Sequence, residues 1–231
     1  MRDELKGHKV VSQDEWISAR KELLKAEKEH VHRLDALSAQ RRELPWVKVE
    51  KNYVFEGPNG KQTLSDLFEG RSQLITYHFM FGPDWEEGCH GCSFLADHFD
   101  GANLHLAHHD VSLVAISRAP YSKLAAFQKR MGWHFKWLSS GDNDFNFDYH
   151  VSFTKEQLAK GKIYYNFEEK EESEMEELPG GSVFYKDKDG AIYHTYSSYA
   201  RGLDALIGAH NFLDLTPKGR NEETTMDWVR H

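Results

Sequence analysis

The stretch Tyr77-His-Phe-Met-Phe-Gly-Pro-Asp-Trp-Glu-Glu-Gly-Cys89-His-Gly-Cys92-Ser-Phe-Leu-Ala-Asp-His-Phe99 decides how this chain folds. An apolar run from Leu74 to Phe81 enters a turn that holds Gly82 and Pro83. The turn ends in a Cys-x-x-Cys pair, which contains the only two cysteines of the chain, and an amphipathic helical pattern follows at once. A strand, a turn and a dicysteine at a helix N-terminus are the layout of a thiol–disulfide site.

The composition narrows the class of protein. A chain of 231 residues with 39% hydrophobic residues is long and apolar enough for one globular domain with an appendage. The net charge of −8 and the absence of a basic face argue against a nucleic-acid partner. No apolar run approaches membrane-spanning length, and the charged start is not a secretory signal. We therefore expect a cytoplasmic protein without a membrane partner, in which a Cys-x-x-Cys pair indicates redox or metal chemistry.

The first 45 residues form a predicted helical extension. Ser12-Gln-Asp-Glu15 has the spacing of a capping box, and Pro45 ends the helical pattern. Between them, apolar residues form one narrow stripe with partly heptad spacing: Ile17, Leu24, Val31, Leu34 and Leu37. Two interpretations stay open: a helix that packs across its own domain, or a subunit-contact helix of a homodimer.

Residues 46–215 alternate between strand and helix patterns. The apolar run Val111–Ser117 follows the dicysteine helix, so the two strands flanking that helix should be parallel in a right-handed βαβ unit. A helix over Tyr121–Met131, a third strand over 135–139, a hairpin over 181–196 and a final helix over Leu203–Phe212 follow. We predict an α/β fold with a central mixed sheet flanked by helices, and a polar tail over 216–231.

Residues from about 140 to 178 interrupt that alternation. The first part is aromatic and acidic together, and the last part, Glu168–Glu177, contains seven glutamates and one lysine. So dense a charge block is usually solvated. We interpret this segment as an acidic and aromatic insertion at the surface.

The positions of the two cysteines suggest different roles for them in the reaction. A thiol becomes a good nucleophile when it loses its proton, and a helix N-terminus favours the anion. We therefore predict that Cys89 attacks and that Cys92, one turn further, resolves the intermediate. His90 between them could stabilise the thiolate when charged, and Trp85 would cover the apolar rim of the site.

A metal site is the main rival interpretation. Four histidines follow the dithiol in the predicted helix: His98, His105, His108 and His109. At 1.5 Å per residue, His105 would lie about 18 Å along the helix from its start, too far to share an ion with a first-turn thiolate. We therefore expect no cofactor and no metal. The alternative of a binding protein whose Cys/His cluster is idle or holds a metal stays open.

The sequence resembles the bacterial thioredoxin-like family catalogued as domain of unknown function 899, from about Glu15 to Asn221. The blocks that carry the resemblance are Arg42-Glu-Leu-Pro-Trp-Val, Tyr77-His-Phe-Met-Phe-Gly-Pro, Gly88-Cys-His-Gly-Cys-Ser, Ser117-Arg-Ala-Pro, Arg130-Met-Gly-Trp, Asp144-Phe-Asn-Phe-Asp, His194-Thr-Tyr-Ser-Ser-Tyr-Ala-Arg-Gly-Leu-Asp and Leu213-Asp-Leu-Thr-Pro-Lys-Gly-Arg.

The resemblance implies a thioredoxin-like fold. In that fold a cis-proline precedes the strand that faces the dithiol, and Pro179 stands at that spacing, although Gly180-Gly181 departs from the usual pattern. The turn before Cys89 is longer than in thioredoxins and is similar to that of peroxiredoxin-like proteins. Its acidic residues, Glu86 and Glu87, should oppose thiolate formation and make the site more reducing.

These features predict a thiol–disulfide oxidoreductase that acts on a protein or small-molecule disulfide. The alternative within enzymes is a peroxiredoxin-like thiol peroxidase, whose cysteine is oxidised to a sulfenic acid. Such a site needs hydrogen-bond donors around the attacked peroxide oxygens, and Arg118, at the end of the neighbouring strand, is the candidate donor.

Overall fold

The computed structural model describes residues 7–171 and 175–229. Its internal contacts divide the chain into two compact units, Met1–Pro45 and Trp46–His231. Within the described ranges, no helix is both long and apolar enough to cross a membrane.

The first unit contains α1 (Gln13–Arg42), a helix of 30 residues, as predicted. The capping box is present, because the Glu15 backbone N–H donates to Ser12 Oγ and the Ser12 backbone N–H donates to the Glu15 carboxylate. Acidic residues in the first turn and arginines in the last turn complement the helix dipole. No residue of α1 is buried, so its apolar stripe is exposed.

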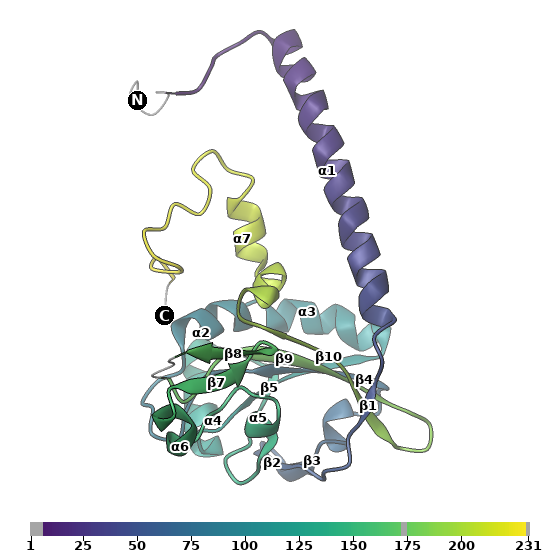
Figure 1. Cartoon of the computed structure of the whole chain (residues 1–231), viewed down its shortest axis with the longest axis vertical. Coiled ribbons are helices and arrows are strands. Elements are labelled where there is room, and N and C mark those ends of the chain that lie inside the picture. The colour runs from purple at the N-terminus through teal and green to yellow at the C-terminus, as the bar shows by residue number, and fades with distance from the viewer. Residues whose placement is uncertain (1–6, 172–174, 230–231) are drawn as a thin grey trace. The chain divides into compact units, whose positions relative to one another are not determined.

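The second unit is built on an eight-stranded mixed sheet with the order β1-β10-β9-β4-β5-β6-β2-β3 (Figure 1). The central strands β4 (Gln73–His78), β5 (Val111–Ser117) and β6 (Lys136–Ser139) are parallel, which confirms the predicted βαβ unit. The hairpin of β9 (Gly180–Lys186) and β10 (Ile192–Tyr199) joins antiparallel to β4. This arrangement is the predicted α/β fold with a central mixed sheet flanked by helices.

Short strands complete the two edges of the sheet. β1 (Val47–Lys48) pairs with β10, and β2 (Val54–Gly57) pairs with β3 (Gly60–Thr63) and with β6. The 3₁₀ helix η1 (Asp66–Phe68) leads from β3 toward β4.

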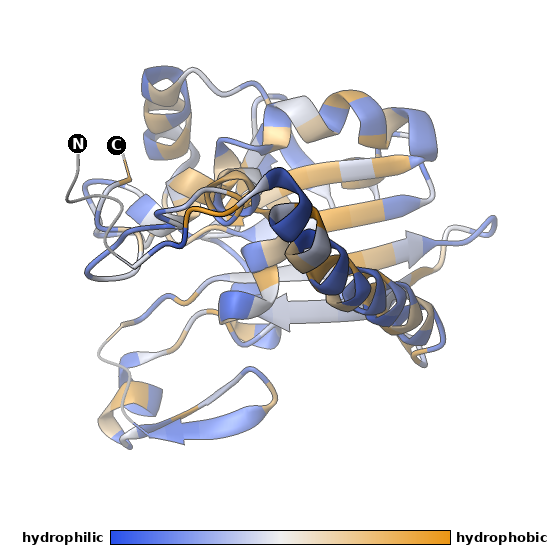
Figure 2. Cartoon of the chain, turned by 90° about the horizontal axis from the view of Figure 1, so that it is seen from above, coloured by the Kyte–Doolittle hydropathy of each residue, from blue (hydrophilic) through white to orange (hydrophobic). Residues whose placement is uncertain are grey.

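Helices cover both faces of the sheet (Figure 1). The helices between β4 and β7 are α2 (His90–Ala96), α3 (Phe99–Leu106), η2 (Ala107–His109), α4 (Tyr121–Met131), α5 (Phe145–Asp148) and α6 (Lys155–Ala159). Successive side chains of a strand point to opposite faces of the sheet, so they enter two separate cores. Tyr77 and Ala115 pack in the core of α2, α3 and α4, whereas Leu74, Val114 and Ile116 pack in the core of α5. Figure 2 shows the hydrophobic colouring along the central strands.

The single helix predicted from the dithiol to His109 is broken in two. His98 stands at the break: its Nδ1 lies 2.9 Å from the Phe94 carbonyl, and its Nε2 accepts from the Ala209 backbone N–H at 3.1 Å. The ring therefore ties the end of α2 to the C-terminal part of the unit. Long-range hydrogen bonds of this kind leave no local sequence signal.

The insertion is only partly the solvated segment that was predicted. Its hairpin of β7 (Lys162–Tyr165) and β8 (Glu168–Glu171) exposes all three β8 glutamates but buries Ile163 and Tyr165 against Tyr199. Glu177 is 1% exposed, which corrects the interpretation of the acidic run at that position. Its carboxylate accepts from Arg118 Nη1 at 2.8 Å and from Ser152 Oγ at 2.6 Å, and this pairing permits its burial. The acidic residues 172–174 lie outside the described ranges.

The chain after β10 forms a 3₁₀ helix, η3 (Ala200–Leu206), and a short helix, α7 (Gly208–Leu213). The final helix predicted over Leu203–Phe212 is thus two shorter elements. Residues 216–229, for which a polar tail is predicted, continue as turns in the same unit.

Candidate active site

The turn before the dithiol is anchored to the sheet at both of its ends. The Cys89 backbone N–H donates to the Met80 carbonyl at 3.1 Å, and the Ala119 N–H donates to the Phe81 carbonyl at 2.8 Å. Gly88 meets a steric requirement, because a Cβ there would lie 2.7 Å from the Phe79 ring. The long turn therefore delivers Cys89 to a defined place at the start of α2.

Cys89 is the N-cap residue of α2, half-buried, and its thiol is free. A hydrogen bond from the Cys92 thiol, supported by the backbone N–H groups of Cys92 and Gly91, lowers the pKa of Cys89 to about 6. Nearby His90 lowers the pKa of Cys89 further, while burial opposes the shift. At neutral pH Cys89 is mainly a thiolate, the reactive form of cysteine.

Cys92 lies one turn further along α2 and is buried. Burial, followed by the hydrogen bond to Cys89, raises the pKa of Cys92 well above its ordinary value. Hydrogen bonding to the Tyr77 hydroxyl opposes this rise in the pKa of Cys92. The pair is thus one accessible thiolate beside one protected thiol, which suits the predicted roles of attack and resolution.

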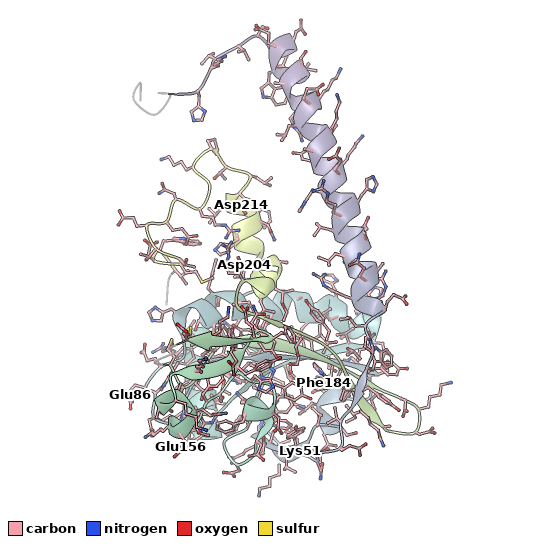
Figure 3. All side chains as sticks on the ribbon, viewed as in Figure 1. Lys51, Glu86, Glu156, Phe184, Asp204 and Asp214 are labelled. Carbon is pink, nitrogen blue, oxygen red and sulfur yellow. The ribbon has the colours of Figure 1, made fainter. Side chains whose placement is uncertain are left out.

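The acidic turn does not have the predicted effect on Cys89. The Glu87 carboxylate accepts from Arg130 Nη1 at 2.6 Å, and the Arg130 guanidinium lies 4.4 Å from the centre of the Phe127 ring. Glu86 is exposed and points outward (Figure 3). Neither carboxylate is among the main groups that shift the pKa of Cys89, and that pKa is lowered rather than raised. The expectation that Glu86 and Glu87 oppose thiolate formation is therefore wrong, because one is paired and both are solvated.

The pKa of Cys89 predicts how its reactivity depends on pH. We expect its alkylation by iodoacetamide to rise with pH with a midpoint of about 6, followed by mass spectrometry. In the Cys92→Ala variant the midpoint should move upward, since the hydrogen bond that most lowers the pKa of Cys89 is removed. A wild-type midpoint near the ordinary value of 9.0 would contradict the assignment.

A pocket of about 300 Å³ opens over the dithiol. One side of it belongs to β4 and α2, with Tyr77, Cys89 and Cys92. The other side is formed by Pro179 and by the chain after β10, which contributes Arg201, Asp204, Ile207, His210, Arg220, Glu222, Thr225 and Met226. Figure 3 marks Asp204 and Asp214 on these C-terminal elements. Residues close to the end of the described chain, up to Met226, are thus part of the wall of the dithiol pocket.

Pro179 lines the pocket, but it does not have the cis bond of the thioredoxin pattern. All peptide bonds among the described residues are trans. The Pro179 carbonyl accepts from the Tyr165 hydroxyl at 2.6 Å, which ties the insertion to this side of the pocket. Trans is also the preferred state of most X–Pro bonds.

Two further predicted residues flank the dithiol without lining its pocket. The Trp85 ring lies against Gly82, where a Cβ would be 2.9 Å from Trp85 Nε1, and it packs on the core that contains Cys92. His90 is exposed at the first position of α2.

Arg118 lies in a different hollow, which it shares with Pro83 and Asn143. Its guanidinium is 4.5 Å from the centre of the Phe147 ring and pairs with the buried Glu177. The structure therefore does not bring Arg118 into the dithiol pocket.

Four residues that line the pocket have no signal in the sequence that predicts it: Tyr77, His210, Arg220 and Met226. Tyr77 reads as an ordinary strand residue, and the other three lie more than a hundred residues after the dithiol in a segment without a motif. Within residues 7–171 and 175–229, no three histidine, cysteine or acidic side chains gather to hold a metal ion.

Comparisons with known proteins place the chain in a family. The family model described as "Bacterial protein of unknown function (DUF899)" matches residues 5–231. The chain belongs to this family. No curated protein matches this DUF899 member.

Solved structures that resemble the DUF899 chain include peroxidoxin BcpB from Mycobacterium tuberculosis, at 16% identity and a TM-score of 0.47, covering 71% of this chain and 94% of that one. Peroxiredoxin Q from Xanthomonas campestris has 13% identity and a TM-score of 0.45, covering 68% and 87%. A putative protein disulfide isomerase from Bacteroides thetaiotaomicron has 16% identity and a TM-score of 0.39, covering 78% and 94%.

Proposed function

We propose that this DUF899 protein is a thiol–disulfide oxidoreductase. The observation that carries the proposal is the pair of unequal thiols at the start of α2. Cys89 has a pKa lowered to about 6 and faces a pocket, whereas Cys92 is buried with a raised pKa. A low-pKa, accessible thiolate beside a resolving thiol is the arrangement that disulfide exchange requires.

The reaction transfers two electrons from the dithiol to the substrate. The Cys89 thiolate attacks one sulfur of the substrate disulfide, a Cys89–substrate bond forms, and the other substrate sulfur leaves as a thiolate that takes up a proton. Cys92 then loses its proton and attacks Cys89 Sγ. The second substrate thiol leaves, and the Cys89–Cys92 disulfide remains. A dithiol reductant returns the enzyme to its starting state by the same exchange in reverse.

The test is to trap the mixed disulfide. In the Cys92→Ser variant the first step should proceed and the second should stop, so a covalent substrate adduct on Cys89 accumulates and is seen as a mass shift after incubation with a disulfide. The Cys89→Ser variant is the matched control and should form no adduct. Absence of an adduct on Cys92→Ser with protein and small-molecule disulfides alike would exclude the proposed function.

A second candidate, thiol peroxidase, is favoured by the donors around the pocket. Thr225 lines it, and so does Arg220, which uses Nε and Nη2 for Asp214 and keeps Nη1 4.0 Å from Asp204. The Cys89 thiolate would attack a peroxide oxygen and become a sulfenic acid as the alkoxide or hydroxide leaves and is protonated. Cys92 would then expel water and close the disulfide. Faster oxidation of Cys89 by hydrogen peroxide than by any disulfide would support this candidate.

We also propose that α1 pairs with a second copy of the chain. Leu24 and Val31 are 39% and 54% exposed on the apolar stripe, and heptad-spaced apolar residues suit a partner helix. Leu24→Glu and Val31→Glu should each raise the dimer dissociation constant at least about tenfold in sedimentation equilibrium, because each removes apolar burial. Ala26→Glu adds the same charge away from the stripe and should have little effect. A monomeric wild-type protein would reject the dimer.

A further inference from the structure

We propose that the substrate of the dithiol is a low-molecular-weight disulfide that carries a polar group, such as an amide, and that His210 binds this group. The inference rests on the proposed function and specifies the substrate class of the same pocket. Three features of the pocket lead to it: a wall beside Cys89, the limited volume, and a buried imidazole without a partner.

The wall is formed by the chain around Met226. A Cβ added to Gly91 would lie 3.0 Å from Met226 Sδ and 4.0 Å from Cys89 Sγ, so the methionine side chain covers the first turn of α2 beside the reactive sulfur. The segment has its own hydrogen bonds. The Met226 N–H donates to the Glu222 carboxylate at 2.5 Å, and the Asp227 carboxylate accepts from the Glu223 and Thr224 N–H groups.

The volume of the pocket limits what reaches Cys89. About 300 Å³ lies at the lower end of the range for small-molecule sites. A disulfide inside a folded protein would approach with two chain segments, and the Met226 side chain already occupies the space beside the reactive sulfur. The dimensions therefore favour a small molecule over a protein disulfide.

His210 supplies the chemistry of recognition. Its side chain lines the pocket and is 1% exposed, and neither ring nitrogen has a hydrogen-bond partner in the described part of the chain. The ring is held between two aromatic neighbours, with centroids 5.1 Å from Phe94 and 6.3 Å from Trp228. Burial, with the Arg220 charge nearby, lowers the pKa of His210, so the ring is neutral at pH 7.

A neutral imidazole has one N–H donor and one nitrogen acceptor. A buried polar group without partners is costly, and a ligand that satisfies it recovers that free energy on binding. An amide can pair with either nitrogen of this ring, because its carbonyl accepts from an N–H and its own N–H donates to an unprotonated nitrogen.

The charged side chains of the wall are less suited than the His210 imidazole to recognise a substrate. Arg220 donates to the Asp214 carboxylate at 2.9 and 3.0 Å, and Arg201 donates to Asp204 at 3.0 Å. The two arginines of the wall are thus already paired with carboxylates of the same segment. The unpaired imidazole is the distinctive polar feature of this wall.

The test compares two substrates in the full-length protein. We expect kcat/KM for the oxidised tripeptide glutathione, a small disulfide with amides, to exceed that for insulin. His210→Phe keeps the aromatic packing but loses both hydrogen-bonding nitrogens, so it should lower kcat/KM for oxidised glutathione about tenfold. His210→Gln keeps a donor and an acceptor and should retain more of that activity. His105→Phe, on an exposed histidine of α3, is the control and should leave it unchanged.

Each outcome decides the inference. Equal loss in His210→Phe and His210→Gln, or no loss in either, would overturn the role of His210. Preference of the wild-type protein for insulin would overturn the substrate class while leaving the proposed function intact. Failure of both substrates together with no adduct on Cys92→Ser would remove the proposed function itself. If the His210 variants do not fold, Met226→Ala decides, since opening the wall should shift the preference toward insulin.

Discussion

Cys89→Ser should lower the rate of disulfide reduction by about 10⁴-fold or more, the scale of loss seen when an enzyme loses its nucleophile. A serine hydroxyl stays protonated at neutral pH, whereas Cys89, with a pKa of about 6, is already a thiolate. The measurement is the reductase rate in an insulin turbidity assay and in a small-disulfide assay, with a dithiol as the electron source.

The control for that loss is the same substitution, cysteine to serine, at the second cysteine. Cys92→Ser keeps the attacking thiolate, so it should still form the first mixed disulfide while it fails to turn over. Both variants should keep the circular dichroism spectrum of the wild-type protein, because one sulfur is replaced by one oxygen in each. Full reductase activity in Cys89→Ser would refute the mechanism.

Arg118→Leu should destabilise the protein by about 3–5 kcal/mol, the usual cost of leaving one partner of a buried ion pair alone. Glu177 is 1% exposed, and Arg118 Nη1 is its only cationic partner among the described residues. The free energy of unfolding, from urea titration at pH 7, gives the measurement. Arg130→Leu, which breaks the exposed pair with Glu87, is the matched control and should change the free energy of unfolding far less than Arg118→Leu does.

The pH dependence of Arg118→Leu follows from the same pair. Burial raises the pKa of Glu177 above its ordinary value of 4.5, and Arg118 and Ser152 oppose the rise. Without Arg118 the pKa of Glu177 rises further in the folded state. A raised carboxyl pKa means that stability is retained below pH 4.5 and lost as the pH rises through the folded-state value. The deficit of the variant should therefore be larger at pH 7 than at pH 4.5.

Adding Glu177→Gln to Arg118→Leu should restore part of the lost stability, because the uncompensated buried charge is removed together with its partner. A double variant less stable than Arg118→Leu would show that Glu177 is not the charge responsible. The pair joins the end of β5 to the segment that leads into β9, so its loss acts on two central strands of the sheet.

The amino-acid sequence by itself determined the central part of the fold and the place of the dithiol. The apolar runs of β4 and β5 and the helical pattern between them specify a parallel βαβ unit, since strand alternation and helix periodicity are local properties. The capping box and the heptad stripe specify α1 for the same reason. The place of Cys89 before the first turn of α2 follows directly from its position in the chain.

Only the tertiary structure decided which residues surround that dithiol. Met226 reaches the first turn of α2 from 135 residues away in the chain. His210 lines the same pocket, although no sequence motif surrounds it. The sequence shows that Arg118 and Glu87 are charged. The effect of each charge depends on its partner, which is buried for Arg118 and exposed for Glu87. Burial and pairing depend on contacts between distant segments, and a pattern read along the chain does not record those contacts.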